Sequence, residues 1–74
     1  MENKILEIIN LIRGNKGLPN VEVLSPDADL REDLDLTSFD LAELTVRIED
    51  EFDIDIFEDG LVNTVGEIFT ILSR

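Results

Sequence analysis

The chain has 74 residues with 18 acidic and six basic side chains, a formal net charge of −12, and it contains no His and no Cys. A chain this short buries only about 60% of its unfolded surface, so residues 1–74 predict a single domain without a large enclosed active site. The missing residue types exclude an imidazole base, a thiolate, a disulfide and a soft-metal site.

The charge and the hydrophobic pattern exclude further classes. Proteins bind nucleic-acid phosphates through Lys and Arg, so a nucleic-acid partner is not expected and partners with basic surfaces are favoured. No apolar run approaches the roughly 18 residues that a membrane span needs, and the start of the chain lacks a secretory pattern. Because 43% of the residues are hydrophobic, we expect a packed domain rather than a disordered chain. We also expect it to be cytoplasmic by default and monomeric, with no membrane span.

The net charge is confined to the middle of the chain. Residues 27–59 hold 14 acidic residues and two Arg, whereas the remaining residues hold four acids and four bases. A run of charge is usually a solvated face that keeps a small protein soluble. The segregation of the charge favours a role in recognition instead.

The first predicted element is an amphipathic helix over residues 3–13. Asn3 is its expected N-cap, Arg13 carries the positive charge favoured at a helix C-terminus, and Gly14 can adopt the left-handed conformation that ends a helix. The prediction depends on apolar residues at spacings of three, four and seven, which are Ile5, Ile8, Ile9 and Ile12.

Residues 14–36 are predicted to form a long loop that scattered aliphatic side chains attach to the core. A connection of this length is unusual in a small domain and indicates a functional role. Within it, Ser25-Pro26-Asp27 is expected to start a single helical turn that ends near Arg31.

The second long helix is predicted to begin after Thr37. The run Thr37-Ser38-Phe39-Asp40 matches a capping box, in which Thr37 is the N-cap and Asp40 reaches back toward it. The helix is expected to end near Asp53. Its core-facing side chains follow at steps of three and four and are Leu41, Leu44, Ile48 and Phe52.

The last third of the chain predicts a minor and a major element. Residues 53–61 are expected to form a turn or a short helix that Gly60 interrupts. Asn63 or Thr64 can cap a final helix, whose apolar face consists of Val65, Ile68, Phe69, Ile71 and Leu72. The predicted fold is therefore all-α, with three main helices, one short helix or turn, and a long loop between the first two helices.

The second helix carries a second apolar strip, formed by Phe39, Ala42 and Val46. At about 100° per residue this strip lies about 140° from the core-facing side chains, so one small core cannot easily cover both. Acidic residues frame the strip, with Asp40, Glu43, Asp50 and Glu51 on one side and Glu49 on the other. This combination favours a docking helix, since charged rims steer association. The alternative is that Phe39 folds over the end of the bundle and the other two are ordinary surface residues.

Ser38 is the hydroxyl placed at the start of the second helix. It has no neighbouring base that would make it a nucleophile by itself, and a capping role is the simplest interpretation. It can also be a substrate of another enzyme, because the free N–H groups and the dipole of a helix N-terminus favour an attached phosphate. A calcium loop is not predicted, since Phe57 occupies a ligand position whether the loop starts at Asp53 or at Asp55.

The run Glu-Asp-Leu-Asp-Leu-Thr-Ser-Phe-Asp at residues 32–40 resembles the signature Glu-Asp-Leu-Gly-x-Asp-Ser-Leu-Asp of the acyl carrier protein family. Residues 48–56 are similar to the acidic end of the family's second helix, and residues 63–65 to the start of its last helix. The resemblance implies a small four-helix bundle in which a separate phosphopantetheinyl transferase attaches 4′-phosphopantetheine from coenzyme A to Ser38 through a phosphodiester.

The resemblance further implies a carrier that is not an enzyme and has no catalytic or metal-binding residues. Acyl or aminoacyl groups would be held as thioesters on the arm, could tuck into the bundle core, and would be delivered to enzymes of fatty-acid, polyketide or related biosynthesis with basic docking surfaces. The positions that match the family's recognition face are Phe39, Asp40, Ala42, Glu43, Val46, Glu49, Asp50 and Ile56. Two alternatives are an unmodified acidic docking module of a larger complex and a calcium-responsive helical protein.

Several residues depart from the family's pattern. Thr37 stands where an Asp is usual, Asp35 stands where the loop usually has Gly, and Phe39 replaces a smaller Leu. Arg47 places a positive charge within the recognition helix. The stretch that follows the second helix is also two residues shorter than in the common bacterial carrier. These departures favour a specialised carrier over the housekeeping carrier of fatty-acid synthesis.

Overall fold

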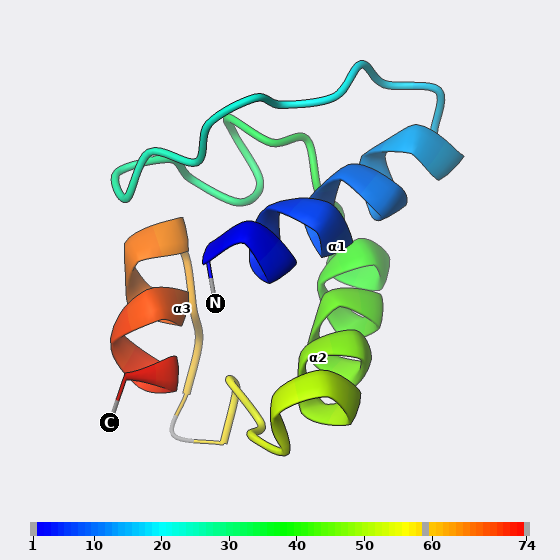
Figure 1. The fold of residues 1–74 in the computed structure, drawn as a ribbon. Helices are drawn as coiled ribbons and strands as arrows, with labels where there is room; N and C mark the ends of the chain where they lie inside the picture. The colour runs from blue at the N-terminus through cyan, green and yellow to red at the C-terminus, as the bar shows by residue number, and fades with distance from the viewer. Residues whose placement is uncertain (1, 59, 74) are drawn as a thin grey trace.

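The computed structural model describes residues 2–58 and 60–73, and the predicted all-α class is confirmed. The described residues form three helices, α1 (Glu2–Asn15), α2 (Ser38–Phe52) and α3 (Val65–Leu72). Figure 1 shows α2 and α3 on opposite sides of the molecule, while the segment after α1 passes over the start of α3 before it returns to the start of α2. None of these helices is long and apolar enough to cross a membrane.

The helix α1 is longer than predicted at both ends. It begins at Glu2, so Asn3 lies inside the helix and is not its N-cap. It also continues through Gly14, and the left-handed residue that follows it is Gly17, with φ 79°. The amide of Leu18 donates to the carbonyl of Arg13 and that of Gly17 to Gly14, both at 3.0 Å. These two bonds form a Schellman motif, which satisfies carbonyls at the helix end. The motif needs a left-handed residue at position 17, and Gly adopts that conformation without steric cost.

The long segment contains two separate turns, at residues 26–27 and 30–34, so the predicted single helical turn ending near Arg31 is wrong. The reason is the side chain of Asp29, whose Oδ1 accepts from the backbone N–H groups of Arg31 and Glu32 at 2.9 Å each. These are the bonds of an N-cap residue, so Asp29 starts the second turn and interrupts the first. Asp29 also forms an isolated antiparallel bridge with Thr64.

Residues 53–58 continue from α2 as a turn, which is the simpler of the two predicted forms for this region; Asp59 lies outside the described residues. Asp53 adopts the left-handed conformation, with φ 58° and ψ 35°, and its amide donates to the carbonyl of Glu49. Asp55 Oδ1 then accepts from the amide of Phe57 at 2.9 Å. The left-handed residue and this side-chain bond end α2 and favour a turn over a short helix.

The core is built from the helices and from both connecting segments. The predicted stripes of α1, α2 and α3 are buried, apart from the partly buried Phe52, Phe69, Ile71 and Leu72. The long segment adds three leucines, and the segment before α3 adds Ile56 and Val62. The buried apolar side chains are Ile5, Ile8, Ile9, Ile12, Leu30, Leu34, Leu36, Leu41, Leu44, Ile48, Ile56, Val62, Val65 and Ile68.

The first turn of α3 is joined directly to the long segment. Thr64 is its N-cap, as predicted for one of two candidates, and its side chain accepts from the amide of Glu67. The amides of Val65 and Gly66 donate to the carbonyls of Ala28 and Pro26 at 3.0 and 2.9 Å. Helix N-terminal N–H groups have no partner within the helix, so these bonds satisfy two of them.

We predict that Gly66→Ala destabilises the fold. A Cβ atom at this position would lie 2.9 Å from the Pro26 carbonyl oxygen and 3.2 Å from the Pro26 Cβ. Because both neighbours belong to the loop that α3 contacts, the expected loss is about 1–3 kcal/mol of unfolding free energy.

Gly14→Ala is the matched control, since a Cβ there has no atom within 4 Å. It lies inside α1 and is expected to gain about 0.5–1 kcal/mol. Urea unfolding followed by circular dichroism measures both changes. Equal effects of the two substitutions would show that α3 does not contact Pro26 this closely.

Candidate functional site

Ser38 is the first residue of α2, and its side chain is exposed. The predicted capping box is confirmed: the amide of Asp40 donates to Thr37 Oγ1 at 3.1 Å, and the amide of Thr37 donates to Asp40 Oδ2 at 2.9 Å. Thr37 therefore caps the helix, and the capping role considered for Ser38 belongs to its neighbour. The Ser38 hydroxyl is left accessible at the positive end of the helix dipole.

Asp40 lies inside the site and not on the outer acidic frame, where the sequence had predicted it. Only 8% of Asp40 is exposed, because its carboxylate serves the capping box and also accepts from Lys16 Nζ at 2.7 Å. The hydrogen bond from Lys16 and then that from the Thr37 amide hold the pKa of Asp40 below its ordinary value of 3.8, although burial acts in the opposite direction. Asp40 thus stabilises the first turn of α2 as a buried carboxylate paired with Lys16 and the Thr37 amide.

The residues that lead into α2 are held from the end of α1. Asp35 has φ 58°, in the left-handed region where the family signature has Gly. Lys16 Nζ donates to the Asp35 carbonyl oxygen, and Arg13 donates to the Leu34 carbonyl oxygen at 2.6 Å. Arg13 is itself buried and also donates to the Pro19 carbonyl oxygen. Arg13 and Lys16 therefore hold residues 34 and 35, which lead into α2 and Ser38.

The second apolar strip of α2 is exposed, as predicted. Phe39 is 84% and Val46 66% exposed, and Ala42 is exposed as well. The alternative in which Phe39 folds over the end of the bundle is therefore wrong. An exposed aromatic and aliphatic strip beside Ser38 is the type of surface that partner proteins use.

The acidic side chains beside the strip differ in their environment. Glu49 and Asp50 are exposed, whereas Glu43 is half-buried and accepts from Arg47 Nε at 2.8 Å. This pair spans one turn of α2, so the positive charge of Arg47 is partly neutralised within the helix. The strip keeps an acidic border at Glu49 and Asp50.

Ile56 does not share this surface. It is 1% exposed and belongs to the core, because the turn after Asp53 directs the chain back under the bundle. The structure therefore corrects its expected place on an exposed recognition face. Ile56 instead contributes to a pocket beside α3.

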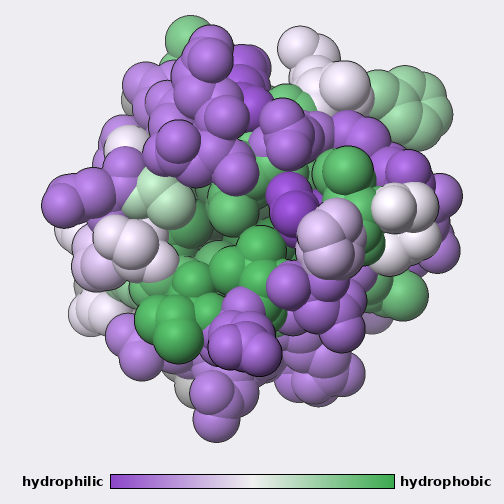
Figure 2. Space-filling model, turned by 90° about the horizontal axis from the view of Figure 1, so that it is seen from above, coloured by the Kyte–Doolittle hydropathy of each residue, from purple (hydrophilic) through white to green (hydrophobic). Residues whose placement is uncertain are grey.

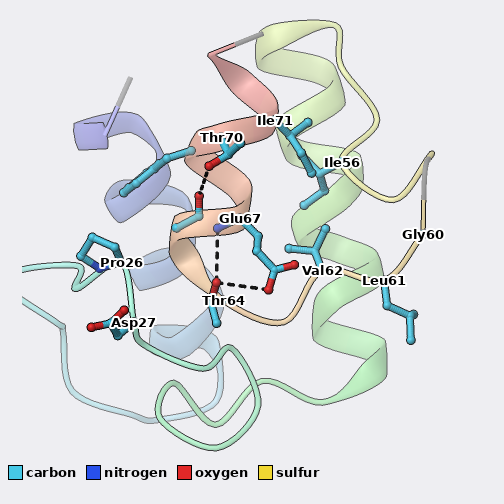
Figure 3. A pocket seen from close by; sticks show the side chains of 12 residues that line it. Pro26, Asp27, Ile56, Gly60, Leu61, Val62, Thr64, Glu67, Thr70 and Ile71 are labelled. Carbon is cyan, nitrogen blue, oxygen red and sulfur yellow. Dashed lines mark hydrogen bonds between the residues drawn. The ribbon is translucent and has the colours of Figure 1, made fainter.

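The pocket has a volume of about 630 Å³ and lies between α3, Ile56, residues 60–62 and the Pro26–Asp27 turn. Figure 3 shows Ile56 and Val62 beside Glu67, Thr70 and Ile71 of α3, with Thr64 at the start of that helix. Figure 2 shows, on the face seen from above in Figure 1, apolar side chains gathered in a hollow that hydrophilic side chains surround. Sequence reasoning did not identify this pocket, because it forms between segments with no shared periodicity.

Lys16 was also missed by the sequence reasoning. Its acceptor on Asp40 lies 24 residues away, and an isolated lysine just beyond a predicted helix carries no pattern. The charge balance of the chain was the available signal, since a cation near the acidic middle segment would be expected to pair with it. Among the described residues, no three acidic side chains converge closely enough to hold a metal ion.

One protein family and several known proteins are similar to this chain over most of its length. The family described as "Phosphopantetheine attachment site" matches residues 6–70. An acyl carrier protein of Syntrophobacter fumaroxidans is 30% identical over 71 residues, which cover 93% of this chain and 86% of that protein. An acyl carrier protein of a Picosynechococcus species is 39% identical over 57 residues, covering 74% of this chain and 70% of that protein. No solved structure matches with significance.

We predict that Lys16→Met raises the pKa of Asp40 toward its ordinary value of 3.8, because the hydrogen bond from Lys16 is the largest cause of the lowering. A carboxyl whose folded-state pKa is lowered stabilises the fold above its unfolded pKa, and this stabilisation is lost as the pH falls through the lowered pKa. The stability difference between the wild type and the variant should therefore be present at neutral pH and disappear in acid.

An NMR titration of the Asp40 carboxyl carbon measures this pKa directly. Lys4→Met is the control, because Lys4 pairs with Glu7 and Glu51 at 3.7 and 3.6 Å and not with Asp40. An Asp40 titration that is identical in the wild type and in Lys16→Met would contradict the ion pair.

Proposed function

Because this chain belongs to the acyl carrier protein family, whose members carry 4′-phosphopantetheine, we propose that Ser38 is the residue to which the arm is attached. The protein is an acyl carrier with a phosphopantetheine prosthetic group, and it is not an enzyme. The observation that carries the proposal for Ser38 is its exposed hydroxyl on the first residue of α2, next to a neighbour that already caps the helix.

The local electrostatics fit an attached phosphodiester. The first N–H groups of a helix have no partner within the helix and attract a negative group. The capping box uses the amide of Asp40. The amide of Ser38 also lies in the first turn, where helix N–H groups face the N-terminal end. A phosphodiester at Ser38 would thus meet positive backbone dipoles, which offset the repulsion from the acidic side chains in this part of the chain.

The chemistry of the chain fits a substrate better than a catalyst. It contains no His and no Cys, and the carboxylate nearest in sequence, that of Asp40, already accepts hydrogen bonds from Lys16 and from the Thr37 amide. We therefore propose that the base that accepts the Ser38 proton comes from the phosphopantetheinyl transferase. The thiol that binds the acyl group arrives with the arm. The chain's own residues present the hydroxyl at a defined position and supply a surface for partners.

We propose that acyl-processing enzymes of fatty-acid or polyketide biosynthesis dock on the exposed strip of Phe39, Ala42 and Val46. Glu43, Glu49 and Asp50 border this strip, so a basic partner surface complements it. Asp40 and Ile56 are buried and are left out of the docking surface. We also propose that the carrier acts as a monomer in the cytoplasm; the core that the described residues of one chain close supports the monomer.

The unmodified docking module is the second candidate. It would use the same exposed strip and the same acidic border, and it would not need Ser38. The match to a phosphopantetheine attachment family over residues 6–70 favours the modified carrier.

We predict that the wild-type protein, incubated with coenzyme A and a broad-specificity phosphopantetheinyl transferase, gains the mass of one phosphopantetheine group. Ser38→Ala should gain none, because the attachment oxygen is absent. Ser25→Ala removes another exposed hydroxyl, from the long segment, and should be modified like the wild type. Intact-mass spectrometry measures all three. A wild type without a mass gain would favour the unmodified module, and a gain that persists in Ser38→Ala would place the arm elsewhere.

We further predict that Val46→Glu weakens docking without unfolding the protein. Val46 is 66% exposed, and a carboxylate would interrupt the apolar strip. The expected rise in the KM of the transferase for the carrier is about tenfold, the effect of losing one contact residue worth about 1.4 kcal/mol.

Leu44→Ala is the contrasting variant, because Leu44 is fully buried. It should lose about 2–5 kcal/mol of unfolding free energy through a cavity. Urea unfolding separates the two effects, and a large loss of stability in Val46→Glu would show that the strip is part of the core.

A further inference from the structure

Lys16 connects the two chain segments on either side of Ser38. It is the residue that follows α1, and its ammonium donates both to the carbonyl oxygen of Asp35 and to Asp40 Oδ2, the latter at 2.7 Å. Asp35 precedes Ser38 by three residues and Asp40 follows it by two. One side chain from the end of α1 therefore bridges the residues before and after the proposed attachment point.

Both acceptors determine the backbone next to Ser38. Asp40 Oδ2 also accepts from the amide of Thr37 at 2.9 Å, so the carboxylate that Lys16 holds is the one that closes the capping box. Asp35 has a left-handed backbone with φ 58°, a conformation that costs free energy in a residue with a side chain. The bond from Lys16 to its carbonyl oxygen stabilises this conformation.

The bridge is partly removed from water. The side chain of Lys16 is 29% exposed and that of Asp40 12%, and the shorter N···O distance also distinguishes this pair from the exposed pair of Lys4 and Glu51 at 3.6 Å. Charge-assisted bonds with limited solvent access are stronger than exposed surface pairs. The surrounding segment of residues 27–59 has a net charge of −12, so removal of Lys16 would also leave acidic groups near Ser38 to repel one another.

We propose that Lys16 is a positioning residue for phosphopantetheine attachment: by bridging Asp35 and Asp40, it holds the first turn of α2 in the conformation that presents Ser38 to the transferase. The proposal rests on the attachment of the arm to Ser38. Lys16 acts through its two acceptors and takes no part in the bond-forming step. Its effect belongs to the orientation of a reacting group, which lowers the barrier without adding binding contacts.

Steady-state kinetics of a broad-specificity transferase test this role with the wild type, Lys16→Met and Lys4→Met as carrier substrates. All are assayed at a temperature at which circular dichroism shows each of them folded. We expect Lys16→Met to lower kcat about fivefold or more while KM stays within about twofold, because orientation and not docking is lost. Lys4→Met removes the same charge from α1 at a pair that does not involve Asp40, and it should match the wild type.

Asp40→Asn shows whether Lys16 acts through the carboxylate. The amide oxygen of Asn can still accept from the Thr37 amide, but it no longer forms an ion pair with Lys16. Adding Lys16→Met to Asp40→Asn should therefore lower kcat less than it does in the wild type. An unchanged kcat in Lys16→Met, an equal loss in Lys4→Met, or a full additional loss in the double variant would each overturn the proposal.

Amide hydrogen exchange measured by NMR is a second test, and it does not depend on the transferase. Lys16→Met should speed exchange at Thr37, Asp40 and Leu41, whose amides form the capping box and the first helical bond. Exchange at the C-terminal turn of α2 should stay unchanged. If the wild type is not modified at all, the attachment at Ser38 fails, while exchange still decides whether Lys16 holds the turn. Unchanged exchange at the three amides would overturn the positioning role.

Discussion

The attachment of the long segment to α1 is the constraint on which the rest of the structure depends. Three helices of 14, 15 and 8 residues offer little apolar surface to one another, and a chain this short can build only one core. Leu30, Leu34 and Leu36 complete that core from the segment between α1 and α2. Arg13 secures the segment through the carbonyl oxygens of Pro19 and Leu34. The contacts that Arg13 makes at the end of α1 therefore position the start of α2, which includes Ser38.

The acidic charge of the chain serves two purposes that composition alone does not separate. Glu49 and Asp50 are exposed beside the apolar strip of α2, where in the docking that we propose they would steer a basic partner. Asp29 and Asp40 instead satisfy backbone N–H groups in the turns before and within the start of α2. Such carboxylates stabilise local conformations, but they also repel one another within the segment. Arg13 in α1 and Lys16 just after it partly offset this repulsion.

A carrier of this kind supplies position and leaves the reaction to its partners. The thiol comes with the phosphopantetheine arm, and the chain has no Cys whose thiol could compete with it. What the protein contributes is an exposed hydroxyl on a capped helix, next to an apolar strip with an acidic border. If Ser38 carries the arm, as we propose, the capping box at Thr37 and Asp40 sets the geometry in which Ser38 meets an active site.

The sequence by itself determined the helical class, the capping box at Thr37 and Asp40, the position of Ser38 and the second apolar strip, because each depends on residues within one or two turns of each other. Two further features are local but were not apparent from the sequence pattern: Asp29 divides the expected helical turn in two, and Gly17, not Gly14, is the left-handed residue that ends α1. Only the tertiary structure decided that Asp40 and Ile56 are buried and that a pocket lies beside α3. Lys16 belongs to this last group. Its partners are 19 and 24 residues away, and a contact across that distance is set by how the long segment packs, which no local periodicity records.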